Sequence, residues 1–477
     1  MSTALAAHTA ERPWRRQVAI PALIVGLSLL AGLAAGDPSP LWYVPLAAIA
    51  GGAVLYAGAR WPFASLLIIL GSTILLVVVR ASGLRAVNLI DVLLPPVFVV
   101  SVFGAARRDA RANVRSGPGH DQLNQAARHF TRSVVVFFAA AALSLFQLAG
   151  QAGTKAALDS ALVLSRAIQG LLLYPLCMWW LHTPSRVARA WSTLFIAGVV
   201  FAIINIIGVT LWQVPRAGMT FFLNNWDAPL SSPNEAGTAT LIVGVVLLVR
   251  HAMKPDWKNP ALGLLMVVLL ALTQSRSGLL AWATFGLLTL RWVKPSRLLT
   301  GGLAVAAVLP LLPMKFWERM VRSVAVERGS FEAFSFFQRL YGWRAAWGIV
   351  QDHPWTGIGY LGFRFVSHRY NELRVVLITV ENYFYEILVS MGIVGLALLA
   401  VVIVRLFQLG HAVGRVAPRG TLAHHMARFH TPLVLGLLVA NLTGDNFVGM
   451  VSIAQMALWT AVLVRSGHTA LAESTRA

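Results

Sequence analysis

Long runs of apolar residues, separated by short polar segments, make up most of the chain. Eleven runs are long; nine of these carry no charge, and two carry a single charge, Asp91 or Arg166. Three further runs, 236–249, 260–273 and 277–290, are short. A helix needs about 20 apolar residues to cross about 30 Å of hydrocarbon. The pattern predicts an all-α, polytopic integral membrane protein with 12–14 transmembrane helices, in which Asp91 and Arg166 pair across two helices.

The composition excludes the soluble classes of protein. Apolar residues make up 57% of the 477 residues and charged residues 12%, whereas charged residues make up about 25% of a typical soluble domain. Too few charges remain to cover a water-exposed surface. The single cysteine, Cys177, excludes an intramolecular disulfide.

The positive charges predict the orientation in the membrane. With the N-terminus in the cytoplasm, the short inside segments hold 24 Lys and Arg and 5 Asp and Glu, and the short outside loops hold 5 of each kind. Cytoplasmic loops carry such a basic excess. The net charge of +21 therefore indicates topology and contact with anionic lipid headgroups, and it does not indicate nucleic acid.

The order of apolar and polar segments predicts five regions. Two polar segments fall on the outer side, and the longer one has about 68 residues between two spans. The predicted regions are a cytoplasmic N-terminus (1–17), a transmembrane body (18–313) with an outer polar loop (213–235), an extracytoplasmic helical cap (314–381), C-terminal transmembrane helices (382–465) and a cytoplasmic tail (466–477).

The cap is rich in aromatic and basic residues. Helical spacing places Arg339, Trp343 and Trp347 on one face of a helix. Pro354 should end that helix near His353, because the residue before a proline avoids the helical conformation. The following Gly357–Gly362 segment fits G-x-G-x-x-G, but it follows a helix rather than a strand. It is therefore interpreted as a glycine turn and not as a dinucleotide site.

Several polar groups lie where spans meet the outer surface. Arg276, between two short spans, is a candidate for function, or a turn arginine that reaches headgroups. Arg216 opens the outer loop, and Ser232 to Glu235 closes it with a helix start that could help to bind an anion or could simply cap the helix.

Glu381 and Asn382 occupy the point where the cap returns to the membrane. Glu381 could act as a base, or it could be an acid that stabilises a helix start. His353 and His368 are further titratable candidates in the cap. No metal-ligand spacing occurs in the sequence, so no metal or cofactor is predicted.

The order of these motifs resembles the O-antigen ligase and O-antigen polymerase family of bacterial envelope glycosyltransferases. The resemblance covers about residues 210–400. It rests on Arg216 and Ser-Pro-Asn234, on Thr-Gln-Ser-Arg276-Ser-Gly, on Gln-Arg339-Leu-Tyr-Gly-Trp343, on His353-Pro-Trp-Thr-Gly-Ile-Gly359 and on Glu381-Asn-Tyr-Phe-Tyr-Glu-Ile-Leu.

The resemblance implies a GT-C-like helical protein of the bacterial inner membrane, with its active site in a large periplasmic loop. It implies transfer of a glycan from undecaprenyl diphosphate to an acceptor hydroxyl on the lipid A–core or on another lipid-linked repeat unit, without a metal. Arg276 and Arg339 would then be catalytic. Arg216, Asn234, Arg344 and Asn382 would bind substrate, and envelope polysaccharide assembly proteins are possible partners.

The sequence differs from the family pattern at the position of the expected catalytic base. Ligases of this family are expected to carry a histidine directly before the asparagine of the last motif, and this sequence has Glu381 there. Glu381 is the candidate base, with His353 and His368 as alternatives. Ligase and polymerase stay open, and so do two other classes: a lipid or glycan transporter (flippase), and a non-catalytic scaffold of an assembly complex.

Overall fold

The fold comes from a computed structural model of the 477-residue chain. It describes residues 61–75, 78–79, 87–88, 97–102, 118–210, 233–292, 331–372, 374–444 and 450–474, together with single residues or pairs at 94, between 296 and 318, and at 447.

Helices make up nearly all of the described chain, which confirms the all-α, polytopic fold. A two-residue antiparallel pair, Val78–Val79 (β1) with Val87–Asn88 (β2), is a small departure from it. The helices are α4 (Pro62–Leu75), α6 (Pro118–Ala152), α7 (Thr154–Trp180), α8 (Pro184–Thr210), α9 (Pro233–Met253), α10 (Lys258–Thr273), α11 (Arg276–Thr289), α14 (Phe331–Asp352), α15 (Phe363–Val366), α16 (Tyr383–Val416), α17 (Leu422–Ala440) and α18 (Met450–Ser474), with 3-10 turns at Leu290–Trp292 (η1) and Ser367–Arg369 (η3).

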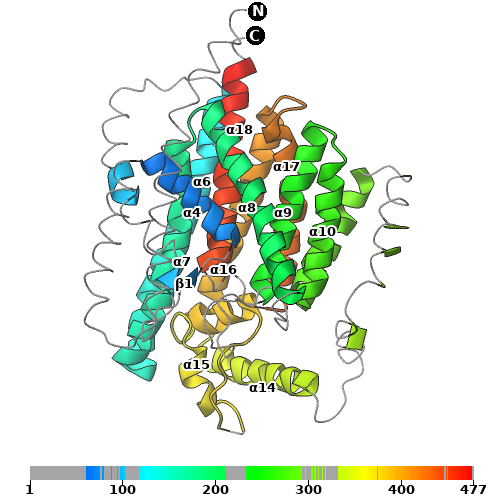
Figure 1. Cartoon of the computed structure of the whole chain (residues 1–477). Coiled ribbons are helices and arrows are strands. Elements are labelled where there is room, and N and C mark those ends of the chain that lie inside the picture. The colour runs from blue at the N-terminus through cyan, green and yellow to red at the C-terminus, as the bar shows by residue number, and fades with distance from the viewer. Residues whose placement is uncertain are drawn as a thin grey trace, which may run out of the picture.

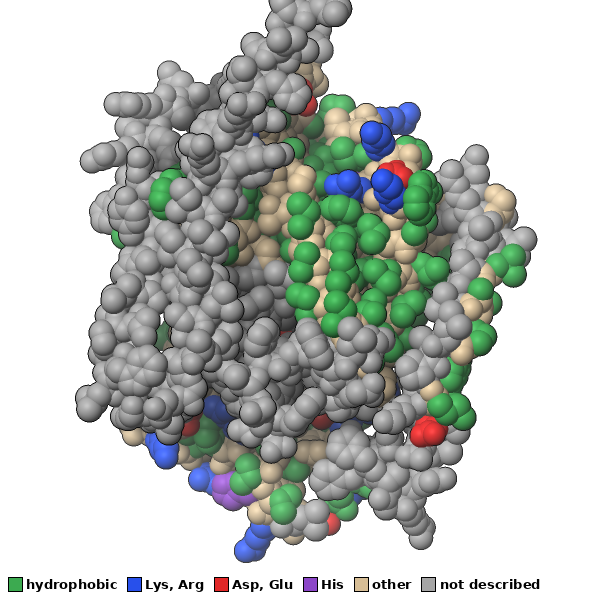
Figure 2. Space-filling view, viewed as in Figure 1, with side chains coloured by type: hydrophobic (Ala, Val, Ile, Leu, Met, Phe, Trp, Pro, Cys, Tyr) green, Lys and Arg blue, Asp and Glu red, His purple; other side chains and the backbone are tan. Residues whose placement is uncertain are grey.

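Among the described residues, five helices are long and apolar enough to cross a membrane: α6, α7, α8, α9 and α16. In Figure 2, hydrophobic side chains cover the middle of the visible face of the described bundle, and Lys and Arg side chains lie toward its two ends. This arrangement suits a bilayer with basic residues at the headgroups. The total of 12–14 spans and the pair of Asp91 with Arg166 stay predictions, because Asp91 and several runs lie outside the described residues.

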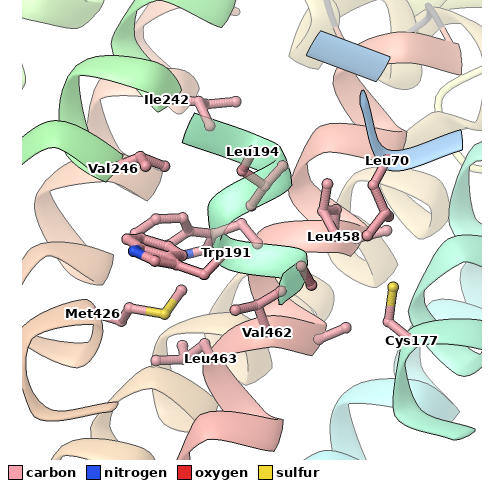
Figure 3. Packing of buried hydrophobic residues seen from close by; sticks show 14 of the residues in the cluster. Leu70, Cys177, Trp191, Leu194, Ile242, Val246, Met426, Leu458, Val462 and Leu463 are labelled. Carbon is pink, nitrogen blue, oxygen red and sulfur yellow. The ribbon is translucent and has the colours of Figure 1, made fainter. Parts of the chain in front are cut away.

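The helices of the body pack around α18 and α9. In Figure 3, Trp191 and Leu194 of α8 lie between Leu458 of α18 and Val246 of α9. Small residues let the helices approach closely: a Cβ atom on Gly244 would lie 2.4 Å from the Trp282 ring, and one on Gly278 would lie 2.9 Å from the Gly237 backbone. Close approach through glycine is how helices associate in lipid, where no hydrophobic force drives them together.

Two helices extend beyond the apolar runs that predicted them. Helix α6 begins at Pro118, well before the charge-free part of the helix that follows Arg132, and α18 continues to Ser474 through most of the predicted tail, 466–477. Hydropathy marks only the part of a helix that lies in lipid. The polar ends remain helical because they pack on each other, as where a Cβ atom on Gly119 would lie 3.2 Å from Leu471.

The cap has its own small core at the other end of the bundle. Helix α14 lies across that end, next to α15 and the start of α16 (Figure 1). Ala345, Ala346 and Ile349 of α14 are fully buried against Phe363 of α15 and Val380. Helix α14 ends at Asp352, which confirms the helix end predicted from Pro354.

Candidate functional site

The chain leaves the cap and begins α16 through a tight turn at Glu381 and Asn382. Glu381 has φ +52°, an uncommon value for a residue with a side chain. Its backbone N–H donates to Thr379 Oγ1 at 2.9 Å. The Asn382 side chain then caps α16 by accepting from Tyr385 N at 3.1 Å. These bonds present the Glu381 side chain at the start of the helix.

An ion pair joins this turn to α14. Arg339 Nε donates to Glu381 Oε2, and the two side chains are 24% and 30% exposed. Trp343, one helical turn further along α14, donates from Nε1 to Val380 O at 3.1 Å. Tyr385 Oη donates to Trp343 O at 3.1 Å. Three contacts therefore fix the predicted Arg339 face of α14 against the start of α16.

Helix α16 is broken at Gly392, where φ is 64° and ψ is −163°. The first backbone N–H groups after the break have no helical partners, because the preceding turn does not continue the helix. A loop of the cap supplies partners instead. Ile393 N donates to Pro354 O at 2.8 Å, and Val394 N donates to Trp355 O at 3.2 Å.

The same loop, residues 353–362, also satisfies carbonyl groups before the break. We call it the glycine loop. Ile358 N donates to Val389 O at 3.0 Å, and Gly359 N donates to Ser390 O at 2.8 Å. Four backbone hydrogen bonds of the loop thus replace bonds that a continuous helix would make, as broken helices of membrane proteins require.

Glycines are required where the loop touches the helices. A Cβ atom on Gly357 (φ 65°) would lie 2.4 Å from Val389 O, and one on Gly359 (φ 102°) would lie 2.5 Å from Leu148 Cβ of α6. The interpretation of this G-x-G-x-x-G segment as a turn is confirmed: it joins α14 to α15, so the element directly before it is a helix and not a strand. Its glycines serve close packing.

Polar residues of α6 also hold the glycine loop. Gln147 Nε2 donates to Thr356 Oγ1 at 3.1 Å and also bonds Gly357 O. Ser144 Oγ accepts from Tyr360 N at 3.0 Å. Gln147 and Ser144 were not predicted from the sequence to be site residues. The available signal was two polar side chains near the C-terminal end of an otherwise apolar run.

A second polar cluster lies where α9 and α11 begin. Ser275 caps α11 by accepting from Gly278 N at 3.0 Å, and it donates to Asn234 Oδ1 at 2.8 Å. The absence of a side chain at Gly237 permits this approach, because an added Cβ atom would lie 3.1 Å from Gly278 Cα. Two helix N-termini, which carry partial positive charge, therefore meet beside Arg276, the first residue of α11.

Helix packing places both clusters at the same end of the bundle. Helices α11 and α17 run antiparallel, since the Phe285 ring lies 6.2 Å from the Phe429 ring between centroids, and a Cβ atom on Gly436 would lie 2.7 Å from Ala281 O. Continuing this register by about 1.5 Å per residue brings the start of α11 level with the end of α17.

The end of α17 in turn contacts the start of α16. Asn441 O accepts from Tyr383 N at 2.9 Å. Asn441 lies directly after α17, and Tyr383 lies two residues after Glu381. The Arg276 cluster and the Arg339–Glu381 pair thus share one end of the helices.

The remaining sequence candidates take different positions. Arg344 is an exposed residue of α14. His353 follows α14 directly, and His368 lies in η3; both are partly buried. Arg216 lies outside the described residues. A pocket of about 400 Å³ lies elsewhere, along the first half of α6, beside Arg128 and Arg132 among others.

A comparison with protein-family models identifies part of the chain. Residues 261–400 match the O-antigen ligase family model, Wzy_C. This match supports the O-antigen ligase and polymerase family for the chain. The O-antigen ligase segment contains Arg276, Arg339, Arg344, Glu381 and Asn382, whereas Asn234 precedes it.

The match also sets the class of activity. The O-antigen ligase family indicates a membrane glycosyltransferase of the ligase or polymerase type, acting on a lipid-linked glycan and an acceptor. A search of curated proteins gave no match.

Proposed function

We propose that the chain transfers a glycan from undecaprenyl diphosphate to a sugar hydroxyl at the periplasmic face of the bacterial inner membrane. The observation that carries this proposal is the Arg339–Glu381 ion pair. It joins a guanidinium group and a carboxylate at the junction of the cap and α16, inside the O-antigen ligase segment. Transfer of a glycan from a diphosphate needs a positive group that stabilises the departing diphosphate and a base that accepts the proton of the acceptor hydroxyl.

Arg339 and Arg276 bind the diphosphate in this proposal. A guanidinium group remains charged and can bind two oxygens of one phosphate at the same time. When the sugar–oxygen bond breaks, its electron pair moves to the phosphate oxygen, and the guanidinium groups stabilise the new charge. Helices α9 and α11 add the partial positive charge of their N-termini beside Arg276.

Glu381 is the proposed base. Its carboxylate accepts the proton of the acceptor hydroxyl while the acceptor oxygen forms the new bond to the anomeric carbon. In the structure Arg339 holds this carboxylate. An arriving diphosphate would compete for Arg339, so donor binding would release Glu381 to accept a proton.

The other candidates have supporting roles in this proposal. Asn234, which accepts from Ser275, and Asn382, which caps α16, hold the two helix starts and bind substrate through their amides. Arg344 and Arg216 bind further phosphate or sugar groups. The acceptor is a sugar of the lipid A–core in a ligase and another lipid-linked repeat unit in a polymerase.

Gel analysis of the envelope glycans of a strain without the gene tests the proposal. Long chains that stay on the carrier lipid indicate a ligase, and single repeat units on the final acceptor indicate a polymerase. Both outcomes support glycan transfer. Repeat units that accumulate only on the cytoplasmic face would indicate a transporter, and an unchanged glycan profile would contradict the proposal.

A further inference from the structure

Trp343 is a fixed aromatic ring with a half-exposed face. Its Nε1 donates to Val380 O, and its own carbonyl accepts from Tyr385. The residue is nevertheless 41% exposed. A large ring that is held in one orientation but left open presents a flat apolar surface.

The position of this ring relates it to the proposed base. Val380, which holds the indole N–H, directly precedes Glu381 in the chain. Arg339, the partner of Glu381, lies one helical turn before Trp343 on α14. The open ring therefore stands beside the charged pair.

The polar surroundings distinguish Trp343 from a tryptophan that contacts lipid. Trp355 is 67% exposed. Its carbonyl accepts from Val394 N and that of the preceding Pro354 accepts from Ile393 N, and Val394 and Ile393 are 49% and 46% exposed. That apolar group suits the membrane interface, where tryptophan gathers. Trp343 instead lies between Arg339 and exposed Arg344.

A sugar ring needs both kinds of surface. Its C–H face is apolar and packs flat on an aromatic ring, whereas its hydroxyl groups need charged or polar partners. Trp343 offers the first and the Arg339–Glu381 pair offers the second. A lipid chain would leave both charged groups without water.

We propose that Trp343 is the platform on which the acceptor sugar stacks, so that its hydroxyl reaches Glu381. This inference rests on the proposed glycan transfer and adds a subsite to it. The stacked ring is the acceptor's, because Glu381 must take a proton from that sugar.

Footprinting tests the contact without requiring turnover. The probe is the oligosaccharide released by mild acid from the envelope glycolipids of a strain that lacks the gene. Hydroxyl radicals oxidise exposed tryptophans in the purified full-length protein, and mass spectrometry locates the products. We expect the oligosaccharide to lower oxidation of Trp343 several-fold and to leave Trp355 unchanged. Equal oxidation of Trp343 with and without oligosaccharide would overturn the proposal.

Transfer kinetics in proteoliposomes provide the second test, with glycolipids of the same strain as substrates. Trp343→Leu should raise the acceptor concentration for half-maximal transfer about tenfold, as for loss of an aromatic stacking contact. Trp343→Phe keeps a ring and should come close to wild type. Trp347→Leu is the matched control, because Trp347 lies one turn further from the pair and is 55% exposed.

The variants distinguish an acceptor subsite from a role of α14 in membrane contact. An equal rise in the half-maximal acceptor concentration for Trp343→Leu and Trp347→Leu would mean that both tryptophans only bind α14 to the membrane. An equal loss in Trp343→Phe would mean that the bond to Val380 matters and the ring face does not. Either result overturns the proposal. Failure of the proposed function looks different: wild type and Glu381→Gln would then give the same transfer rate.

Discussion

Substitution of Gly392 by alanine should separate the two parts of α16 from the glycine loop. The Cβ atom would lie 2.2 Å from Trp355 C and 2.3 Å from Trp355 O. The backbone at Gly392, with φ 64° and ψ −163°, is also open essentially to glycine alone. Holding alanine there costs about 1–3 kcal/mol.

The clash adds to this strain. Relief requires Trp355 to move away, which weakens the bonds from Ile393 N to Pro354 O and from Val394 N to Trp355 O. Each is worth about 1 kcal/mol. The total is on the order of 3–5 kcal/mol, a large share of the roughly 5–15 kcal/mol that stabilises a folded protein.

Thermal unfolding of the purified protein in detergent measures the effect. Gly263→Ala in α10 is the matched control, because a Cβ atom on Gly263 meets nothing within 4 Å. We expect Gly392→Ala to unfold several degrees below wild type and Gly263→Ala to unfold at or above the wild-type temperature. Equal unfolding temperatures for the two variants would refute the role of the glycine loop in bridging the break.

Three further predictions concern other parts of the fold. Gly410→Ala should destabilise by at least 1–3 kcal/mol in denaturant unfolding, because its Cβ atom would lie 2.1 Å from the buried His430 ring. Ser275→Ala should cost about 1–2 kcal/mol in the same assay, because it removes the cap of α11 and the bond to Asn234. Burial and nearby Arg465 lower the pKa of His468 from 6.5 to about 4, so the unfolded chain takes up the proton first and stability falls as pH drops from about 6.5 to 4. His468→Gln should lose less stability than wild type between about pH 6.5 and 4, as measured by thermal unfolding at each pH. An equal loss of stability in the two proteins would contradict the lowered pKa of His468.

Local sequence patterns predicted the helical fold and the end of α14, but not the break in α16 at Gly392. Apolar runs marked the spans, and Pro354 marked the end of α14 at Asp352. The limits of α6 and α18 were missed, because a helix end held by packing in water carries no hydropathy signal.

Contacts between distant segments could not be read from the sequence. Gly357 and Gly392 both have a positive φ, and each lies against the chain segment that contains the other. The residues next to each glycine in the sequence give no sign of this contact. Arg339 and Glu381 were separate candidates, 42 residues apart, and only the folded chain shows that they pair. The orientation of Trp343 depends on the same tertiary contact.

Transfer by the charge-altered variants tests the central claim most directly. Purified wild-type protein, Arg339→Ala and Glu381→Gln would be placed in proteoliposomes with the lipid-linked glycan and acceptor from a strain that lacks the gene. We expect wild type to move the glycan to the acceptor, and both variants to leave it on the carrier lipid at equal protein levels. Transfer at the wild-type rate by either variant would contradict the account.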